Sequence, residues 1–159
     1  MKKTLLLFLF IFAAAASQAC PFCQEKILKA QGFYESETVI ALIPSRPAGP
    51  GHVLVLPKRH IERFEELTDQ EMIEIKEATR KIDAMAQKMF HNQAYMFVQK
   101  NGVAAGQSVP HMHFHYLPRY NEEGHIRFGI RYLISRWFKS AKPPEEIEKQ
   151  AAIFRLQLE

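Results

Sequence analysis

The chain has 159 residues, of which 47% are hydrophobic and 24% are charged, and its formal net charge is +4. This length indicates one domain, and the apolar fraction is sufficient for a single core without disulfide staples. Two of the positive charges, Lys2 and Lys3, lie in a segment that we expect to be removed. The small charge that remains does not indicate a nucleic-acid-binding protein, so we expect no nucleic acid partner.

Residues 1–19 have the pattern of a secretory signal peptide, with a positive start, an apolar run over residues 5–16 and two small residues at the cleavage site before Cys20. The apolar run is too short to span a bilayer comfortably. We therefore expect an exported protein, periplasmic or secreted, whose mature domain is residues 20–159 and has no stable membrane span. A lipoprotein linked through Cys20 and an uncleaved anchor are the alternatives.

Turn residues and apolar periodicity predict the elements that follow. A short helix is expected over 24–31, strands over 38–43 and 52–57, and a loop between these strands because 44–51 holds three prolines and two glycines. The next elements are a long helix from Thr68 to about Met89, a strand over 94–99, a turn over 101–107, a strand over 110–118 and a C-terminal helix after two prolines.

The long helix has a capping box, because Glu71 follows Thr68 by three residues. Its apolar residues at helical spacing are predicted to be core: Met72, Ile75, Ala78, Ile82 and Met85. Strands and helices do not alternate regularly, which favours an α+β fold with an antiparallel sheet, a long helix and a C-terminal helix.

Residues 109–119 read VPHMHFHYLPR, with three histidines at alternate positions. On a strand His111, His113 and His115 would share one face, and the apolar residues between them would be buried on the other. From the first to the third histidine a strand spans about 13 Å, whereas a zinc–nitrogen bond is about 2.0 Å. At most two adjacent histidines can therefore share one metal ion.

A nucleophile fits this pattern better than a metal cage does. Neutral imidazole attacks phosphorus near neutral pH, and its neighbours can hold the reactive tautomer. The preceding GVAAGQS supplies small residues that let the backbone approach an anion, and Gln107 and Ser108 add side-chain donors. Taken without this turn, alternating histidines fit a metal-binding or solvated strand equally well.

Two segments, AGQSVPHMHFHYLPR and PGHVLVLPKRH, resemble the motifs of the histidine triad (HIT) family of nucleotide hydrolases and transferases. The resemblance implies an antiparallel sheet with helices, often a homodimer, and cleavage of a bond to a nucleoside-linked α-phosphate through a nucleotidyl-histidine intermediate. It makes His113 the nucleophile, His115 a phosphate contact and Ser108 the residue that assists the leaving group. The implied substrate-binding residues are His52, Asn101, Gly106 and Gln107.

Two positions depart from the family pattern. An aspartate that binds ribose hydroxyls is usual at the position of Pro44, where Ser45 offers only a partial substitute. An asparagine or glutamine is usual at the position of Lys100, and the adjacent Asn101 is expected to take that role. Both changes affect substrate recognition rather than the chemistry, so the nucleoside is less well defined than the reaction.

The chain's two cysteines, Cys20 and Cys23, leave three readings open: a redox pair, a disulfide or half of a zinc site. No strand precedes them, which disfavours the redox pair, whereas an oxidising compartment permits a disulfide. The resemblance to one branch of the family implies structural zinc bound by Cys20, Cys23, His60 and His111. His91 and His125 have no predicted partner and are expected to be ordinary surface or core histidines.

The sequence thus predicts an exported enzyme of the histidine triad type that acts on a nucleotidyl phosphoanhydride or phosphoramidate. One alternative is related phosphate chemistry on a non-nucleoside substrate, which Pro44 motivates. Another is a zinc-binding or interaction module without turnover. The presence of Gly106, Gln107, Ser108, His113 and His115 together favours catalysis.

Overall fold

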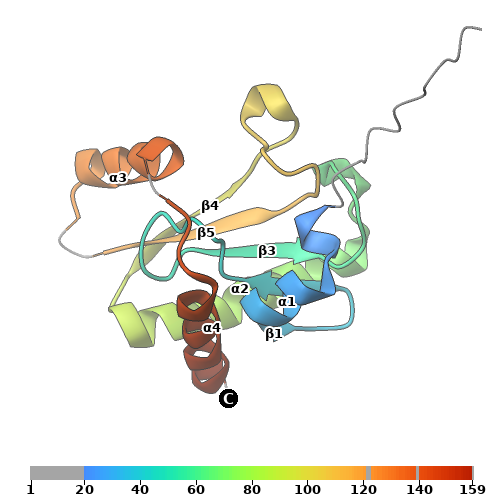
Figure 1. The fold of residues 1–159 in the computed structure, drawn as a ribbon, viewed down its shortest axis with the longest axis horizontal. Helices are drawn as coiled ribbons and strands as arrows, with labels where there is room; N and C mark the ends of the chain where they lie inside the picture. The colour runs from blue at the N-terminus through green and yellow to red at the C-terminus, as the bar shows by residue number, and fades with distance from the viewer. Residues whose placement is uncertain (1–19, 121–122, 139, 159) are drawn as a thin grey trace, which may run out of the picture.

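The computed structural model describes residues 20–120, 123–138 and 140–158, so the predicted signal peptide, residues 1–19, lies outside the described residues. The described chain forms one five-stranded sheet with the order β1-β2-β3-β5-β4, in which every neighbouring pair is antiparallel (Figure 1). The strands are β1 (Gly32–Glu35), β2 (Val39–Leu42), β3 (Val53–Pro57), β4 (Ala94–Gln99) and β5 (Phe114–Arg119).

The helices of the described chain are α1 (Glu25–Gln31), α2 (Asp69–Phe90), α3 (His125–Phe138) and α4 (Pro144–Leu158). Short 3₁₀ turns are η1 (Pro21–Cys23), η2 (Phe64–Glu66) and η3 (Val103–Ala105). None of the helices in the described ranges is both long and apolar enough to cross a membrane. The predicted α+β fold is confirmed.

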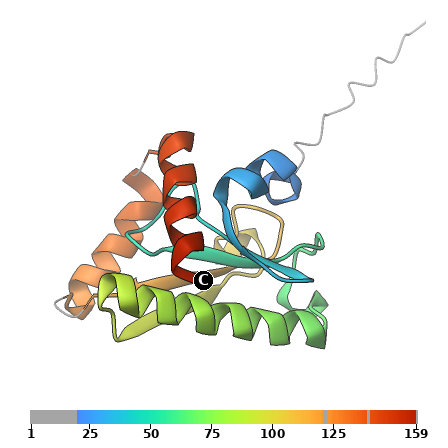
Figure 2. The ribbon, with the colours of Figure 1, turned by 90° about the horizontal axis from the view of Figure 1, so that it is seen from below.

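The core lies between one face of the sheet and the helices α2 and α4, which pack against each other (Figure 2). Alternate strand residues point to this side, which is why they are apolar: Val39, Ala41, Val53, Val55, Phe114 and Tyr116. The opposite face carries a smaller cluster in which Ile40, Leu42, Leu54 and Leu56 pack against Phe22 and Leu28. His115, which pairs with Leu54, lies on this second face.

Helix α2 begins as predicted. The Thr68 hydroxyl accepts a hydrogen bond from the Glu71 backbone N–H at 3.2 Å, and the Glu71 carboxylate accepts one from the Thr68 backbone N–H at 2.8 Å. The expectation that Met72 is core is wrong, because this side chain is 36% exposed. In this turn of the helix the buried residue is Glu71, which lies four residues before the buried Ile75 on the same helix face. The Met72 side chain points about 100° away from that face.

Two elements were not predicted, and one was predicted too long. β1 and α3 had no clear pattern in the sequence. The predicted strand over 110–118 begins only at Phe114, because the Met112 backbone N–H donates to the Ile61 carbonyl at 2.7 Å rather than to a neighbouring strand. His111 and His113 therefore lie on the segment that leads into β5, and only His115 lies within the strand.

Candidate active site and metal cluster

The sheet register places His115 in the centre of the second face. It lies across from Leu54 of β3 on one side and from Val98 of β4 on the other. The ring of His113 lies 5.0 Å from that of His115, centroid to centroid, and both imidazoles are largely removed from water. The two histidines therefore form one site although only one of them belongs to a strand.

A chain of hydrogen bonds defines which nitrogen of His115 carries the proton. The Ala48 backbone N–H donates to His52 Nδ1 at 2.8 Å, so His52 must carry its proton on Nε2. That Nε2 lies 3.1 Å from His115 Nδ1, which therefore accepts. The proton of neutral His115 is consequently on Nε2, where it can donate to a phosphate oxygen.

His113 has the opposite tautomer. Its Nδ1 lies 2.6 Å from the His111 carbonyl oxygen, which can only accept, so Nδ1 carries the proton. The lone pair is then on Nε2. A neutral imidazole with a free Nε2 is the form that attacks as a nucleophile.

The surroundings keep these histidines neutral. Burial lowers the pKa of His113, and the charge of Lys100 lowers it further, against the hydrogen bond to the His111 carbonyl that raises it. Burial, with the neighbouring His52, His113 and Lys100, lowers the pKa of His115 to about 2. Both rings are therefore neutral at neutral pH, as nucleophilic attack requires.

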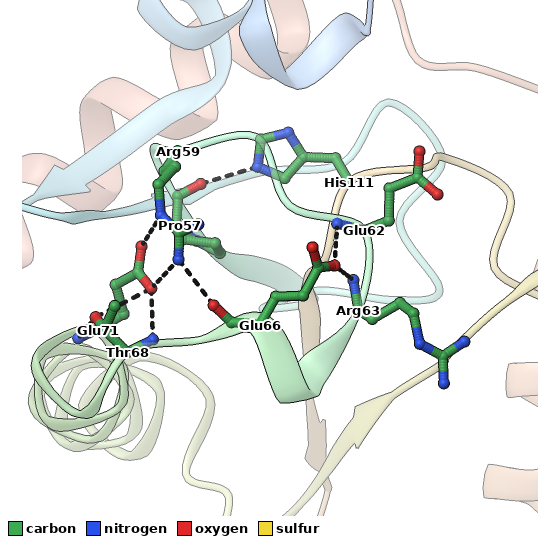
Figure 3. Close-up of polar contacts among 8 residues, drawn as sticks. All are labelled: Pro57, Arg59, Glu62, Arg63, Glu66, Thr68, Glu71 and His111. Atoms are coloured by element: carbon green, nitrogen blue, oxygen red, sulfur yellow. Dashed lines mark hydrogen bonds and ion pairs between the residues drawn. The ribbon is translucent and has the colours of Figure 1, made fainter.

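His111 turns away from this pair and toward the cysteines. Its Nε2 donates to the Pro57 carbonyl at 2.9 Å, which leaves Nδ1 as a lone pair (Figure 3). This Nδ1 lies 3.5 Å from Cys20 Sγ and 3.6 Å from Cys23 Sγ, and His60 Nδ1 lies 3.3 Å from Cys23 Sγ. The cysteines form no disulfide.

These four side chains fit a zinc ion. Their ligand atoms lie within 4.8 Å of one another. A sulfur and a nitrogen on one tetrahedral zinc are about 3.5 Å apart, given the usual bond lengths, and the three sulfur–nitrogen distances agree with this value. The donor set of two thiolates and two imidazoles, with the Pro57 carbonyl orienting His111, is typical of a closed structural site.

Hydrogen bonds to η2 and to the start of α2 hold the segment that carries His60. Arg59 donates to the Glu71 carboxylate at 2.9 Å and to the Glu66 carbonyl at 2.8 Å (Figure 3). The Glu66 carboxylate accepts from the backbone N–H groups of Glu62 and Arg63 at 3.1 and 2.8 Å. Burial acts to raise the pKa of Glu71, but the bonds from Arg59 and Thr68 outweigh it and lower that pKa. The segment that carries His60 is thereby fixed to the start of α2.

The HIT domain family profile matches residues 25–122. The chain belongs to the HIT family. An uncharacterized HIT-like protein of Methanocaldococcus jannaschii is 38% identical over 113 residues, 69% of this chain and 87% of that protein. A bis(5'-adenosyl)-triphosphatase of Dictyostelium discoideum is 34% identical over 81% of this chain and 86% of its own length. An adenosine 5'-monophosphoramidase of Schizosaccharomyces pombe is 32% identical over 82% and 91%.

Solved HIT structures have the same fold. A HIT family protein of Bacillus subtilis superposes with a TM-score of 0.58 at 30% identity, over 78% of this chain and 100% of that one. A zinc-bound histidine triad protein of Mycobacterium smegmatis gives a TM-score of 0.65 at 23% identity, over 88% and 93%.

Of the predicted substrate-binding residues, one contacts the histidines and the others belong to the 101–107 turn. His52 lies within the site, hydrogen-bonded to His115. Gln107 is buried and braces the turn, since its Oε1 accepts from the Gly102 N–H at 2.6 Å and its Nε2 donates to the Glu62 carbonyl at 2.8 Å. Gly106 has a left-handed φ of 86°, which lets the chain turn toward an exposed Ser108.

The side chain of Asn101 forms its hydrogen bonds with η2. Its Oδ1 accepts from the Phe64 N–H at 3.0 Å, and its Nδ2 donates to the Glu65 carboxylate at 3.0 Å. Phe64 contacts Phe114, whose side chain belongs to the core face of the sheet. The amide of Asn101 is thus used to attach the turn to η2.

Sequence reasoning missed two contributors to the HIT site. The Phe22 ring packs edge-on against His113, with the ring centroids 5.3 Å apart, and against His111 at 5.8 Å. The Ala48 backbone N–H sets the tautomer of His52. A phenylalanine between two cysteines was a visible signal, whereas a backbone donor leaves no signal in the sequence.

Proposed function

We propose that this HIT protein is a nucleotide hydrolase or nucleotidyl transferase that cleaves a phosphoanhydride or phosphoramidate through a nucleotidyl-histidine intermediate. The observation that carries the proposal is the pair of opposite tautomers. His113 offers a lone pair on Nε2, and His115 offers a proton on Nε2, 5.0 Å away between ring centroids. The nucleophile and the hydrogen-bond donor to the phosphate thus lie side by side.

In the first step the Nε2 lone pair of His113 forms a bond to the α-phosphorus. The bond from phosphorus to the leaving group breaks, and its electron pair goes to the leaving oxygen or nitrogen, which takes a proton from the exposed Ser108 hydroxyl while solvent water returns one to Ser108. His115 donates to a non-bridging oxygen and stabilises the developing charge. Water or another acceptor then attacks phosphorus, loses its proton and restores His113.

The relatives support this choice of substrates. The Dictyostelium discoideum relative is named a bis(5'-adenosyl)-triphosphatase, and the Schizosaccharomyces pombe relative an adenosine 5'-monophosphoramidase. One substrate is an anhydride and the other an amide of a nucleoside monophosphate. The shared element is the nucleotidyl group that His113 would hold.

The test is to quench turnover of a radiolabelled substrate. Wild type should yield an acid-labile, base-stable nucleotidyl adduct, and His113→Ala should lose both adduct and turnover. His125→Ala is the control, because His125 is exposed and contacts Arg119 rather than the site. Direct attack by water would give no adduct in any protein, and turnover by His113→Ala would remove His113 from the mechanism.

We also propose that Cys20, Cys23, His60 and His111 bind one structural zinc ion. When bound, zinc would tie η1 to the segment after β3, which carries His60, and to the segment before β5, which carries His111, so that Phe22 stays against His113. Metal analysis of protein prepared under reducing conditions should give about one zinc per chain. Metal-free protein of undiminished stability would contradict this assignment.

Export and a homodimer complete the proposal. Cleavage after Ala19 is checked by the intact mass of protein made in its native host, where a mass that includes Met1 would exclude the cleaved form.

A dimer is supported by β4, an edge strand with a 43% exposed Tyr95, and by α3, which exposes Ile126, Ile130, Leu133 and Ile134. Light scattering at micromolar concentration should give twice the chain mass.

A further inference from the structure

Lys100 lies beside the active-site histidines although it belongs to neither histidine triad motif. In the register of β4 and β5, Gln99 pairs with Phe114 and Val98 with His115. Lys100 and His113 directly adjoin the first of these pairs, each just outside its strand, so both lie at the same end of the β4–β5 pairing.

Within residues 20–120, 123–138 and 140–158, no carboxylate forms an ion pair with Lys100. Its ammonium group lies over the ring of Tyr132, 5.6 Å from the centroid. The side chain is half-buried, and its charge contributes to the lowered pKa of both His113 and His115, after burial. A cation thus lies within electrostatic reach of the reacting groups.

Helix α3, which lies above β4 and β5 in Figure 1, holds this lysine in place. Arg131 attaches the helix to the sheet, since it pairs with the largely buried Glu123 at 2.6 Å and donates to the Pro118 carbonyl at 3.1 Å. The next residue is Tyr132. Arg131 is neutralised by Glu123, so Lys100 differs from it in having a charge available for a ligand.

We propose that Lys100 binds the phosphates of the leaving group, beyond the α-phosphate, and so makes nucleoside polyphosphates the preferred substrate class of this site. The inference rests on the proposed function and deepens it. Hydrogen bonds between Gly102 and Gln107 bring the two ends of the 101–107 turn together, so Lys100 lies on the same side as Ser108, the residue expected to assist the leaving group. Tyr132 is a positioning residue, whose ring holds the ammonium group by a cation–π contact. A phosphoramidate offers no anion at this position, whereas an anhydride does.

The first measurement is binding without turnover. In a His113→Ala background, calorimetry should show at least tenfold tighter binding of adenosine triphosphate than of adenosine monophosphate. Lys100→Gln should reduce this ratio at least fivefold, and Lys100→Arg should keep most of it. Lys76→Gln, an exposed lysine on α2, is the matched control and should leave the ratio unchanged. A ratio that Lys100→Gln does not alter would overturn the proposal.

The second measurement uses the otherwise wild-type protein and two substrates with the same nucleotidyl group. Lys100→Gln should lower kcat/KM for diadenosine triphosphate at least fivefold more than for adenosine 5'-monophosphoramidate. Tyr132→Leu should have a smaller effect in the same direction, and Tyr132→Phe, which keeps the ring, should restore discrimination. Equal losses on both substrates would overturn the leaving-group assignment.

The two proposals fail differently. If wild-type protein hydrolyses neither substrate while Lys100→Gln still abolishes the triphosphate preference, the enzymatic proposal fails and Lys100 stands as a phosphate-binding residue. If wild type hydrolyses both and Lys100→Gln changes neither the ratio of affinities nor that of kcat/KM, the enzyme stands and the role of Lys100 is refuted. Circular dichroism of each variant checks that it is folded.

Discussion

Replacing His52 by alanine should slow turnover by about 5- to 160-fold, although His52 contacts His115 and not the attacking nitrogen of His113. The Ala48 N–H fixes His52 as a donor, and His52 fixes His115 with its proton on Nε2. Without His52, His115 Nδ1 loses its donor, and the proton can move there. Nε2 would then present a lone pair to a phosphate oxygen instead of a proton.

The magnitude follows from the hydrogen bond that is lost. An unmade bond to a buried group costs about 1–3 kcal/mol, and each 1.36 kcal/mol of barrier corresponds to about tenfold in rate. Because the bond orients a group that acts on the developing charge, the loss should appear mainly in kcat. His52→Gln, whose amide N–H can donate to the same nitrogen, should regain part of the rate.

The assay combines steady-state kinetics with NMR of ¹⁵N-labelled histidine, which reports the protonated ring nitrogen directly. Wild type should give Nε2–H for His115, and His52→Ala should give Nδ1–H or a mixture. The reasoning would be refuted by a variant in which His115 keeps its proton on Nε2 and kcat stays within twofold of wild type. A slower variant with an unchanged tautomer would mean that His52 acts through packing alone.

Three further outcomes concern stability. The Tyr116 hydroxyl donates to Asp83 at 2.7 Å and accepts from Asn92 at 3.4 Å, so Tyr116→Phe should lower the free energy of unfolding by about 1.5–3 kcal/mol in urea titrations; a loss below 0.5 kcal/mol, on the order of a neutral surface change, would contradict this. Cys23→Ser should abolish stoichiometric zinc and lower the melting temperature, whereas an unchanged zinc content would assign the metal elsewhere. Burial lowers the pKa of His115 from 6.5 to about 2, so between these pH values the unfolded chain binds more protons than the folded chain. The free energy of unfolding should therefore fall as pH drops below 6.5, by up to about 1.4 kcal/mol per pH unit. If chelator-treated protein has the same free energy of unfolding from pH 7 to pH 5, this contribution of His115 is excluded.

The sequence by itself determined the elements whose signals are local. The capping box of Thr68 and Glu71 begins α2 where the pattern places it, and β4 has the predicted bounds 94–99. The alternation around His115 predicts which side chains enter the core, because a strand has a period of two. The HIT motifs and the Cys20–Cys23 pair also come from the sequence, through resemblance to a known family.

The tertiary structure alone decided the chemistry of each histidine. His52 and His115 lie 63 residues apart in the chain, and Cys20 and His111 lie 91 apart, so no local pattern fixes their distances. The tautomers depend on backbone groups of other segments, and a backbone donor or acceptor is the same at almost every residue. In the sequence Lys100 is only a departure from the family pattern, whereas the pairing of β4 with β5 brings it to the same end of the sheet as His113. Local periodicity reports which face of a strand or helix is buried, whereas the order of strands in the sheet determines which side chains meet.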